Sequence, residues 1–133
     1  SQAFYRERVY LQMGFSSLED YLITGWEGRY LQLDANDILA MVYTWQNGDI
    51  SDNPLYSGDF HKALGSTKAK AIVMPSRTDQ YFPPEDNEIE VGHMPNAELR
   101  VIPTIWGHIG GGPGRNPADT KFIDDALKEL LAS

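Results

Sequence analysis

The sequence predicts an α/β fold with about two parallel strands and flanking helices, forming the C-terminal edge of a larger doubly wound sheet. Two short runs, Ala69–Pro75 and Glu98–Pro103, are apolar at their centres, which is typical of strands buried on both faces of a parallel sheet. The residues from the end of the first run to the end of the second are enough for a loop, a helix and a return strand. Because two strands leave edges that need neighbours, we expect the rest of the sheet to come from outside these residues.

Helices are expected before these strands. Ser17 lies in a motif, S-S-L-E, that is typical of a capping box, so a short helix is predicted to begin near it and to end at Gly25 and Gly28. Asp34 is predicted to cap a second helix over about residues 35–47, where apolar side chains recur at helical spacing.

Three further helical segments are expected in the second half of the chain. A helical turn is predicted over residues 60–65, and Pro83-Pro84 can open a helix that runs to about Met94. Asn116-Pro117 begins the last helix, which has the clearest amphipathic pattern in the chain. Its apolar stripe consists of Phe122, Ile123, Ala126, Leu127, Leu130 and Leu131.

The change in character near residue 60 predicts two parts. Residues 1–60 are interpreted as a helical lid or cap segment, and residues 61–133 as the β-α-β-α part of a larger core. The first residue is not methionine, so we also expect the chain to begin inside a longer or processed protein.

Composition argues against several classes of partner. The 133 residues carry a net charge of −8 at pH 7, and a polyanion such as nucleic acid would be repelled. The chain has no cysteine, which rules out disulfides and thiolate chemistry and fits a reducing, cytoplasmic location. No run approaches the roughly 18 apolar residues of a membrane span. We therefore expect neither a nucleic-acid nor a membrane partner.

Neither a metal site nor a phosphate site is favoured. His61, His93 and His108 have no histidine four residues away. The glycine-rich run at 110–114 could hold a phosphate at the start of the last helix, but it lacks the Lys-Ser/Thr pair and the dinucleotide-binding spacing. We interpret this run as a flexible loop beside His108.

A carboxylate follows the first predicted strand directly. Asp79 lies in the turn S-R-T-D, and ligand sites in open α/β sheets lie beyond the carboxyl ends of the strands. A carboxylate at this place can accept a hydrogen bond from an imidazole and hold the ring in one tautomer. Aspartate is also common in turns and at helix caps, so a purely structural role is the alternative for Asp79 taken alone.

A histidine follows the second predicted strand. His108 lies in I-W-G-H-I-G-G-G, where glycines allow a tight turn that leaves the imidazole exposed, although an ordinary loop histidine is the alternative. An acid and then a histidine at the tips of neighbouring strands predict the acid and base of a Ser-His-Asp triad. Trp106, Tyr81 and Phe82 flank the two residues and are predicted to form a pocket wall.

The nucleophile of such a triad is missing from the sequence. No G-x-S-x-G motif occurs, and the serines at 16, 17, 51, 57, 66 and 76 lack its flanking glycines. Asp79 and His108 cannot carry out acyl transfer without a nucleophile and an oxyanion hole. We therefore expect this chain to be inactive by itself.

Three segments resemble the homoserine O-acetyltransferase family of α/β-hydrolase-fold proteins. They are L-D-A-N-D-I-L-A-M at 33–41, A-K-A-I-V-M-P-S-R-T-D-Q-Y-F-P-P-E-D-N at 69–87, and A-E-L-R-V-I-P-T-I-W-G-H at 97–108. The resemblance implies a C-terminal portion of an α/β-hydrolase-type sheet, with Asp79 and His108 in the triad and a helical lid before them. It also implies acetyl-CoA as acyl donor, a homoserine-like alcohol as acceptor, and no bound cofactor.

The residues after His108 depart from that family, in which an acidic residue and a short helix usually follow the histidine; here I-G-G-G-P-G-R-N-P-A-D follows. The leading hypothesis is the C-terminal part of an acyltransferase, whose nucleophile lies in the N-terminal part of the same fold, on the same gene product or a separate chain. One alternative is an esterase of that fold, and either enzyme would act on a small-molecule substrate. The other alternative is a non-catalytic binding or assembly module. A homo-oligomer is a further association that we consider.

Overall fold

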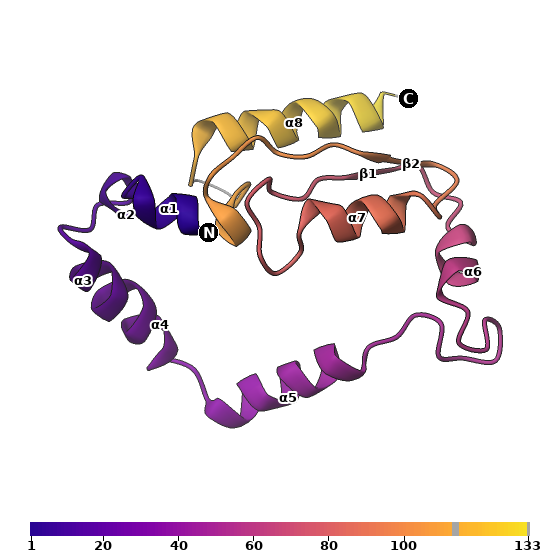
Figure 1. The fold of residues 1–133 in the computed structure, drawn as a ribbon, viewed down its shortest axis with the longest axis horizontal. Helices are drawn as coiled ribbons and strands as arrows, with labels where there is room; N and C mark the ends of the chain where they lie inside the picture. The colour runs from indigo at the N-terminus through magenta and orange to yellow at the C-terminus, as the bar shows by residue number, and fades with distance from the viewer. Residues whose placement is uncertain (113–114, 133) are drawn as a thin grey trace.

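A computed structural model describes residues 1–112 and 115–132, and it contains a small α/β unit from which an arc of helices extends (Figure 1). The unit consists of β1 (Ala71–Val73), α7 (Pro84–Val91), β2 (Ala97–Leu99) and α8 (Pro117–Leu131). The strands lie between α7 and α8, which cover opposite faces of the sheet (Figure 1). The predicted order of strand, helix, strand and helix is therefore confirmed.

The two strands pair in parallel, but they are shorter than the sequence predicts. Ala71 pairs with Ala97 and Val73 with Leu99, and an isolated bridge between Ser76 and Ile102 continues the pairing past the strand ends. The expectation that the first strand is buried on both faces is wrong for this chain, since the three residues of β1 are only half-buried. Within the described residues each strand has a single neighbour, which leaves the other edge without backbone partners.

The arc precedes the α/β unit in the sequence and consists of short helices and one longer helix. They are α1 (Gln2–Arg6), α2 (Val9–Gln12), α3 (Leu18–Asp20), the π-helical η1 (Tyr21–Glu27), α4 (Gly28–Tyr30), α5 (Ala35–Asn47) and α6 (Phe60–Gly65). The chain starts beside the α/β unit, runs away from it through α3, α4 and α5, and returns through α6 (Figure 1). The helices predicted for residues 35–47 and 60–65 are both present.

Side-chain caps define the starts of α3 and α5, as the sequence predicts. The Ser17 hydroxyl accepts a hydrogen bond from the Asp20 amide at 3.0 Å, and the Asp20 carboxylate accepts one from the Ser16 amide at 2.8 Å. The Asp34 carboxylate likewise accepts from the Asn36 amide at 2.7 Å at the start of α5. The amides of Asp20 and Asn36 lie in first helical turns, where they have no partner within the helix, and the caps satisfy them.

The prediction that the first helix ends at Gly25 and Gly28 is wrong. α3, η1 and α4 follow one another without interruption to Tyr30. A Cβ atom on Gly25 would lie 3.0 Å from the Phe15 ring and 3.2 Å from the Tyr21 ring, so this glycine allows two aromatic rings to approach the helix backbone. Gly25 therefore allows close packing inside a continuous helix, whereas glycine is more often expected to end one.

A mostly aromatic hydrophobic cluster joins the first residues of the chain to the loop after β2. Its buried members are Phe4, Val9, Tyr10, Tyr21 and Trp106. The rings of Phe4 and Trp106 meet edge to face, with centroids 6.1 Å apart, and the Ser1 hydroxyl donates to the Ile105 carbonyl at 2.8 Å. The beginning of the segment interpreted as a lid thus packs directly against the loop that carries His108.

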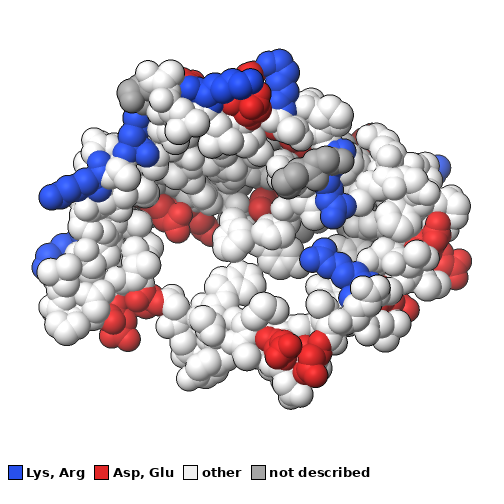
Figure 2. Space-filling view, turned by 180° about the vertical axis from the view of Figure 1, so that it is seen from behind, with Lys and Arg blue, Asp and Glu red and all other residues white. Residues whose placement is uncertain are grey.

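Helix α5 is largely uncovered. None of its residues is buried, and the residues Leu39, Tyr43 and Trp45 are 65%, 69% and 59% exposed. Openings separate the arc from the α/β unit when the molecule is viewed from behind (Figure 2). The described residues therefore do not fill the space that the arc encloses.

Among residues 1–112 and 115–132, no helix is both long enough and apolar enough to cross a bilayer.

We expect Gly28→Ala to raise the free energy of unfolding by about 0.5–1 kcal/mol, because alanine loses less conformational freedom than glycine inside a helix. The nearest atom to a Cβ at this position is the Ile23 carbonyl oxygen, at an ordinary contact distance of 3.5 Å. Gly25→Ala is the matched variant, and its Cβ would press on the rings of Phe15 and Tyr21. In thermal unfolding, the melting temperature of Gly28→Ala should be higher than that of wild type, and that of Gly25→Ala should be lower than that of Gly28→Ala. The reverse ranking would contradict the packing role of Gly25.

Candidate active site

Asp79 lies in the loop that follows β1, just beyond the bridge between Ser76 and Ile102. Its amide donates to the Ser76 carbonyl at 3.0 Å, which closes a tight turn. One carboxylate oxygen, Oδ1, accepts hydrogen bonds from the amides of Tyr81 at 2.8 Å and Phe82 at 3.3 Å. Only 7% of the side chain is exposed, so the loop holds a shielded carboxylate in one orientation.

His108 lies in the loop that follows β2, at the centre of a short 3₁₀ turn, Gly107–Ile109. Gly107 has a left-handed backbone, with φ of 61°, and a Cβ there would lie 2.9 Å from the Ser1 nitrogen. Only glycine fits both the backbone conformation and this close approach. The turn presents the imidazole with 47% of its surface exposed.

The structure brings Asp79 and His108 into direct contact. Oδ2 of Asp79 lies 3.0 Å from Nδ1 of His108. A carboxylate at that distance favours the tautomer with the proton on Nδ1, which leaves Nε2 free to accept a proton. Within residues 1–112 and 115–132, no hydrogen bond occupies Nε2.

The pKa of Asp79 is lowered by its surroundings. Burial is the largest single influence and acts to raise the pKa of this carboxyl. The hydrogen bonds from the Tyr81 amide, the His108 ring and the Phe82 amide, together with the charge of His108, act in the opposite direction and prevail. The result is a pKa below the ordinary value of 3.8, so the carboxylate is ionised near neutral pH.

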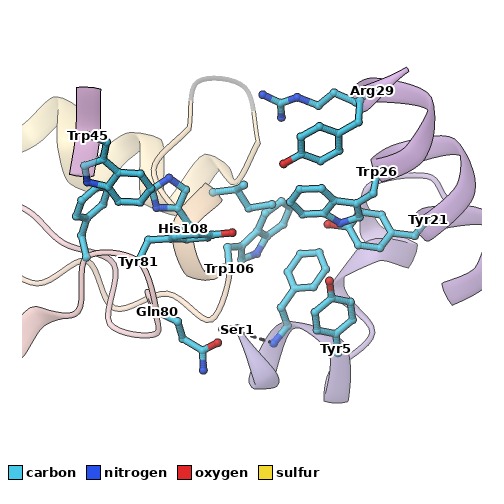
Figure 3. A pocket seen from close by; sticks show the side chains of 14 residues that line it. Ser1, Tyr5, Tyr21, Trp26, Arg29, Trp45, Gln80, Tyr81, Trp106 and His108 are labelled. Carbon is cyan, nitrogen blue, oxygen red and sulfur yellow. Dashed lines mark hydrogen bonds between the residues drawn. The ribbon is translucent and has the colours of Figure 1, made fainter. Parts of the chain in front are cut away.

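A cavity of about 800 Å³ opens beside His108 (Figure 3). The three predicted wall residues, Trp106, Tyr81 and Phe82, all line it. The ring centroids of Tyr81 and Phe82 lie 4.7 and 5.5 Å from that of His108, so both rings contact the imidazole. This volume is in the range of small-molecule sites, which are mostly apolar with a few polar groups.

Much of the cavity wall comes from residues that the sequence did not assign to the site. Trp26 and Arg29 border it on the side opposite Tyr81 and His108 (Figure 3). Trp45 of α5 also lines it and packs against Phe82, with centroids 5.8 Å apart. The remaining contributors are Ser1, Phe4, Tyr5, Tyr21, Tyr30, Gln80 and Ile109. The density of aromatic residues before residue 46 is the one sequence signal that could have identified this wall.

Other ligand sites find less support in the described part of the chain. There, no group of three or more His, Asp or Glu side chains is placed to hold a metal ion. The rings of His61 and His93 are stacked with centroids 3.7 Å apart, a face-to-face arrangement rather than one that points ring nitrogens at a common centre. In the predicted glycine loop, Gly110–Gly112 are described, whereas Pro113 and Gly114 lie outside the described residues.

Comparison with known proteins relates the whole chain to esterases. No protein-family model matches the chain. Over its full length it is 36% identical to a probable esterase of Corynebacterium glutamicum and 38% identical to an ethyl acetate hydrolase of Pseudomonas veronii, and it spans 37% of each relative. A solved acetylester hydrolase from Corynebacterium glutamicum matches all of the chain with a TM-score of 0.90 and 35% identity, and the match covers 37% of that protein. The acetyl esterase MekB matches with a TM-score of 0.89 and 37% identity, over 38% of its length.

Homoserine O-acetyltransferases are also related, but at lower identity. The enzyme of Chloroherpeton thalassium is 27% identical over 86% of the chain, and that of Salinibacter ruber is 26% identical over 77%. These similarities support a relationship with the α/β-hydrolase superfamily. Within it, the chain is more similar to the esterases than to the acetyltransferases that the sequence motifs resemble.

We expect the free energy of unfolding to fall in acid through Asp79. Because its folded-state pKa lies below 3.8, the ionised carboxylate stabilises the fold at higher pH, and this contribution disappears as the pH falls through the lowered pKa. The stability advantage of wild type over Asp79→Asn should therefore shrink as the pH falls from neutral through 3.8 towards the lowered pKa. Urea unfolding across this range measures it.

Asp52→Asn is the matched control for this titration. Asp52 is exposed and lies in the turn region between α5 and α6, with no side-chain hydrogen bond among the described residues. Its substitution removes one carboxylate and leaves the contact between Asp79 and His108 intact, so the loss of stability in acid that wild type shows should persist in Asp52→Asn. A wild-type advantage over Asp79→Asn that stays constant as the pH falls below 3.8 would contradict the lowered pKa of Asp79.

Proposed function

We propose that this chain is the acid- and histidine-bearing part of an ester hydrolase of the α/β-hydrolase fold, which acts on small acyl esters such as acetates. The observation that carries the proposal is the 3.0 Å contact between Asp79 Oδ2 and His108 Nδ1 beside an aromatic cavity. The similarity of the full chain to esterases and acetylester hydrolases supports the same reaction.

The reaction requires a serine supplied by another part of the protein. The serine oxygen attacks the acyl carbon of the ester, and His108 takes the hydroxyl proton on Nε2. The ester C–O bond then breaks, the alcohol leaves with that proton, and an acyl-enzyme remains. Water repeats the sequence, giving its proton to His108 and releasing the carboxylic acid, after which the proton returns to the serine oxygen. Asp79 stays ionised throughout and stabilises the imidazolium.

The remainder of the protein is proposed to occupy the space that the arc encloses. The chain spans about 37% of the length of the esterases it matches. Within the described residues, the edge of β1 that faces away from β2 has no partner, and such an edge accepts a further strand. A nucleophile-bearing segment paired there would bring its strand end to the edge of the sheet where His108 lies.

The comparisons support hydrolysis more than transfer to a homoserine-like acceptor. The chain is 36% and 38% identical to the two esterases, against 27% and 26% to the two acetyltransferases. The cation Arg29 in the cavity lining fits either reaction, because it can pair with the carboxylate of an amino-acid acceptor. Transfer from acetyl-CoA to an alcohol is the second candidate, since homoserine O-acetyltransferases are related at lower identity.

The activity test uses the complete protein that contains this chain together with the nucleophile-bearing part. We expect it to hydrolyse p-nitrophenyl acetate, and His108→Ala should lower kcat by at least about a thousandfold because the serine loses its base. His93→Ala is the matched control, because His93 lies beside His61 and does not line the cavity. Activity that survives in His108→Ala would rule out the proposed role of this imidazole.

We expect the 133-residue chain alone to show no turnover of p-nitrophenyl acetate above that of buffer, since it has no serine in a nucleophile motif. Progress curves at high protein concentration measure this, with the complete protein as positive control. Turnover by the chain that is lost in His108→Ala would reveal a nucleophile within these residues. For the complete protein, faster consumption of acetyl-CoA in the presence of homoserine than in its absence would favour the transferase candidate instead.

A further inference from the structure

A threonine hydroxyl links the two loops of the candidate site. Oγ1 of Thr78 donates a hydrogen bond to the Thr104 carbonyl at 3.2 Å and accepts one from the Gly107 amide at 3.1 Å. Both of its partners lie in the loop after β2, 26 and 29 residues further along the chain. One side chain thus uses its donor and one of its acceptor positions across the gap between the loops.

The positions of the linked residues connect this hydroxyl to the acid–histidine pair. Thr78 immediately precedes Asp79, and Gly107 immediately precedes His108. Gly107 is also the first residue of the 3₁₀ turn that presents the imidazole. A displacement of the Gly107 amide would therefore move the ring, and a displacement of Thr78 would move the carboxylate that the ring contacts.

Few other hydrogen bonds join the two loops within the described residues. The Arg77 amide donates to the Ile102 carbonyl at 3.0 Å, which belongs to the strand pairing before the site. Beyond that point the hydrogen bonds between the described parts of the loops are the two of Thr78 and the one between Asp79 and His108. The rings of Tyr81 and Phe82 also pack against the imidazole. The geometry of the pair therefore depends on Thr78 more than on continued backbone pairing.

Thr78 acts on the loops and not on the cavity. It does not line the aromatic cavity, whereas Tyr81, Trp106 and His108 do. The loop after β2 is also stabilised by an internal hydrogen bond, in which the Thr104 hydroxyl accepts from the Trp106 amide at 3.2 Å. A Cβ on Gly110 would lie 2.6 Å from Thr104 Cγ2, so the far end of this loop also packs closely on Thr104. The loop after β2, to which Thr78 is hydrogen-bonded, is thus closely packed, so a shift of Thr78 would also shift His108.

We propose that Thr78 is a positioning residue, whose hydroxyl holds the Asp79 loop and the His108 loop in register so that the carboxylate and the imidazole stay in hydrogen-bond contact. The expected effect on kcat rests on the ester hydrolase function proposed above. The contact itself can be measured without that function. Threonine is suited to the role because its branched side chain has a restricted χ1 angle, which fixes the direction of the hydroxyl.

The kinetic test uses the complete protein with p-nitrophenyl acetate as substrate. Thr78→Val keeps the shape of the side chain and removes the hydroxyl, and we expect it to lower kcat by about tenfold to a hundredfold. KM should stay within about twofold, because a residue outside the cavity makes no contact that binds substrate. Thr78→Ser retains the hydroxyl and should recover most of kcat.

Thr120→Val is the matched control. Its hydroxyl also donates to a backbone carbonyl, that of Asn116 at 3.1 Å, but it lies in the first turn of α8, outside the cavity lining. It should leave kcat and KM unchanged. Equal activity of Thr78→Val and wild type would overturn the proposal, as would a Thr78→Ser variant as impaired as Thr78→Val.

Proton NMR of the His108 ring separates positioning from general destabilisation. In wild type the proton on Nδ1 is held by Asp79 and should give a downfield resonance protected from exchange with water. This resonance should broaden or disappear in Thr78→Val at temperatures where circular dichroism shows the fold intact, and it should persist in Thr78→Ser and Thr120→Val. A sharp, unshifted resonance in Thr78→Val would overturn the positioning role.

The two proposals fail in different ways. If wild type lacks esterase activity, or if His108→Ala retains it, the proposed function fails, and the NMR resonance still decides whether Thr78 holds the contact. If wild type is active and His108→Ala is not, normal kcat and a normal resonance in Thr78→Val overturn the positioning role alone.

Discussion

The parallel pairing of β1 with β2 is the constraint on which the candidate site depends. Parallel strands carry their carboxyl ends to the same edge of a sheet, so the loops that follow them begin side by side. The pairing ends at the bridge between Ser76 and Ile102, and Asp79 and His108 lie on the two loops just beyond it. A slip in this register would separate the two side chains along the strand direction. The contact between acid and imidazole is therefore a consequence of backbone pairing as well as of their own chemistry.

The half-buried strands, the uncovered helix α5 and the wide cavity have a common explanation. A parallel strand is normally covered on both faces and paired on both edges, whereas each strand here has one neighbour within the described residues. The chain also corresponds to 37% of the length of the esterases that it matches. Apolar surface left exposed on this scale usually marks a place where other protein packs. These features agree with our proposal that a nucleophile-bearing part completes the sheet and the site.

Local chemistry made much of the fold predictable. The starts of the helices at Ser17, Asp34 and Asn116 follow from side chains that accept hydrogen bonds from free amides of the first turn, and such caps depend on a few neighbouring residues. The order of strands and helices in the α/β unit follows from apolar periodicity. The proximity of Asp79 and His108 was also predictable, because parallel topology converts a position after each strand into a position in space. The amino-acid sequence by itself thus determined the helix starts, the strand order and the facing pair.

Only the tertiary structure decided how these parts meet. The helix passes through Gly25 because the rings of Phe15 and Tyr21 pack against it there, and no local propensity encodes that approach. Phe4 enters the cavity wall through its contact with Trp106, and Thr78 reaches the loop that carries His108. Such contacts join residues that are distant in the chain, as the 104-residue separation of Ser1 and Ile105 illustrates. Periodicity and capping describe neighbours along the chain, so they carry no information about which distant side chains a folded core brings together.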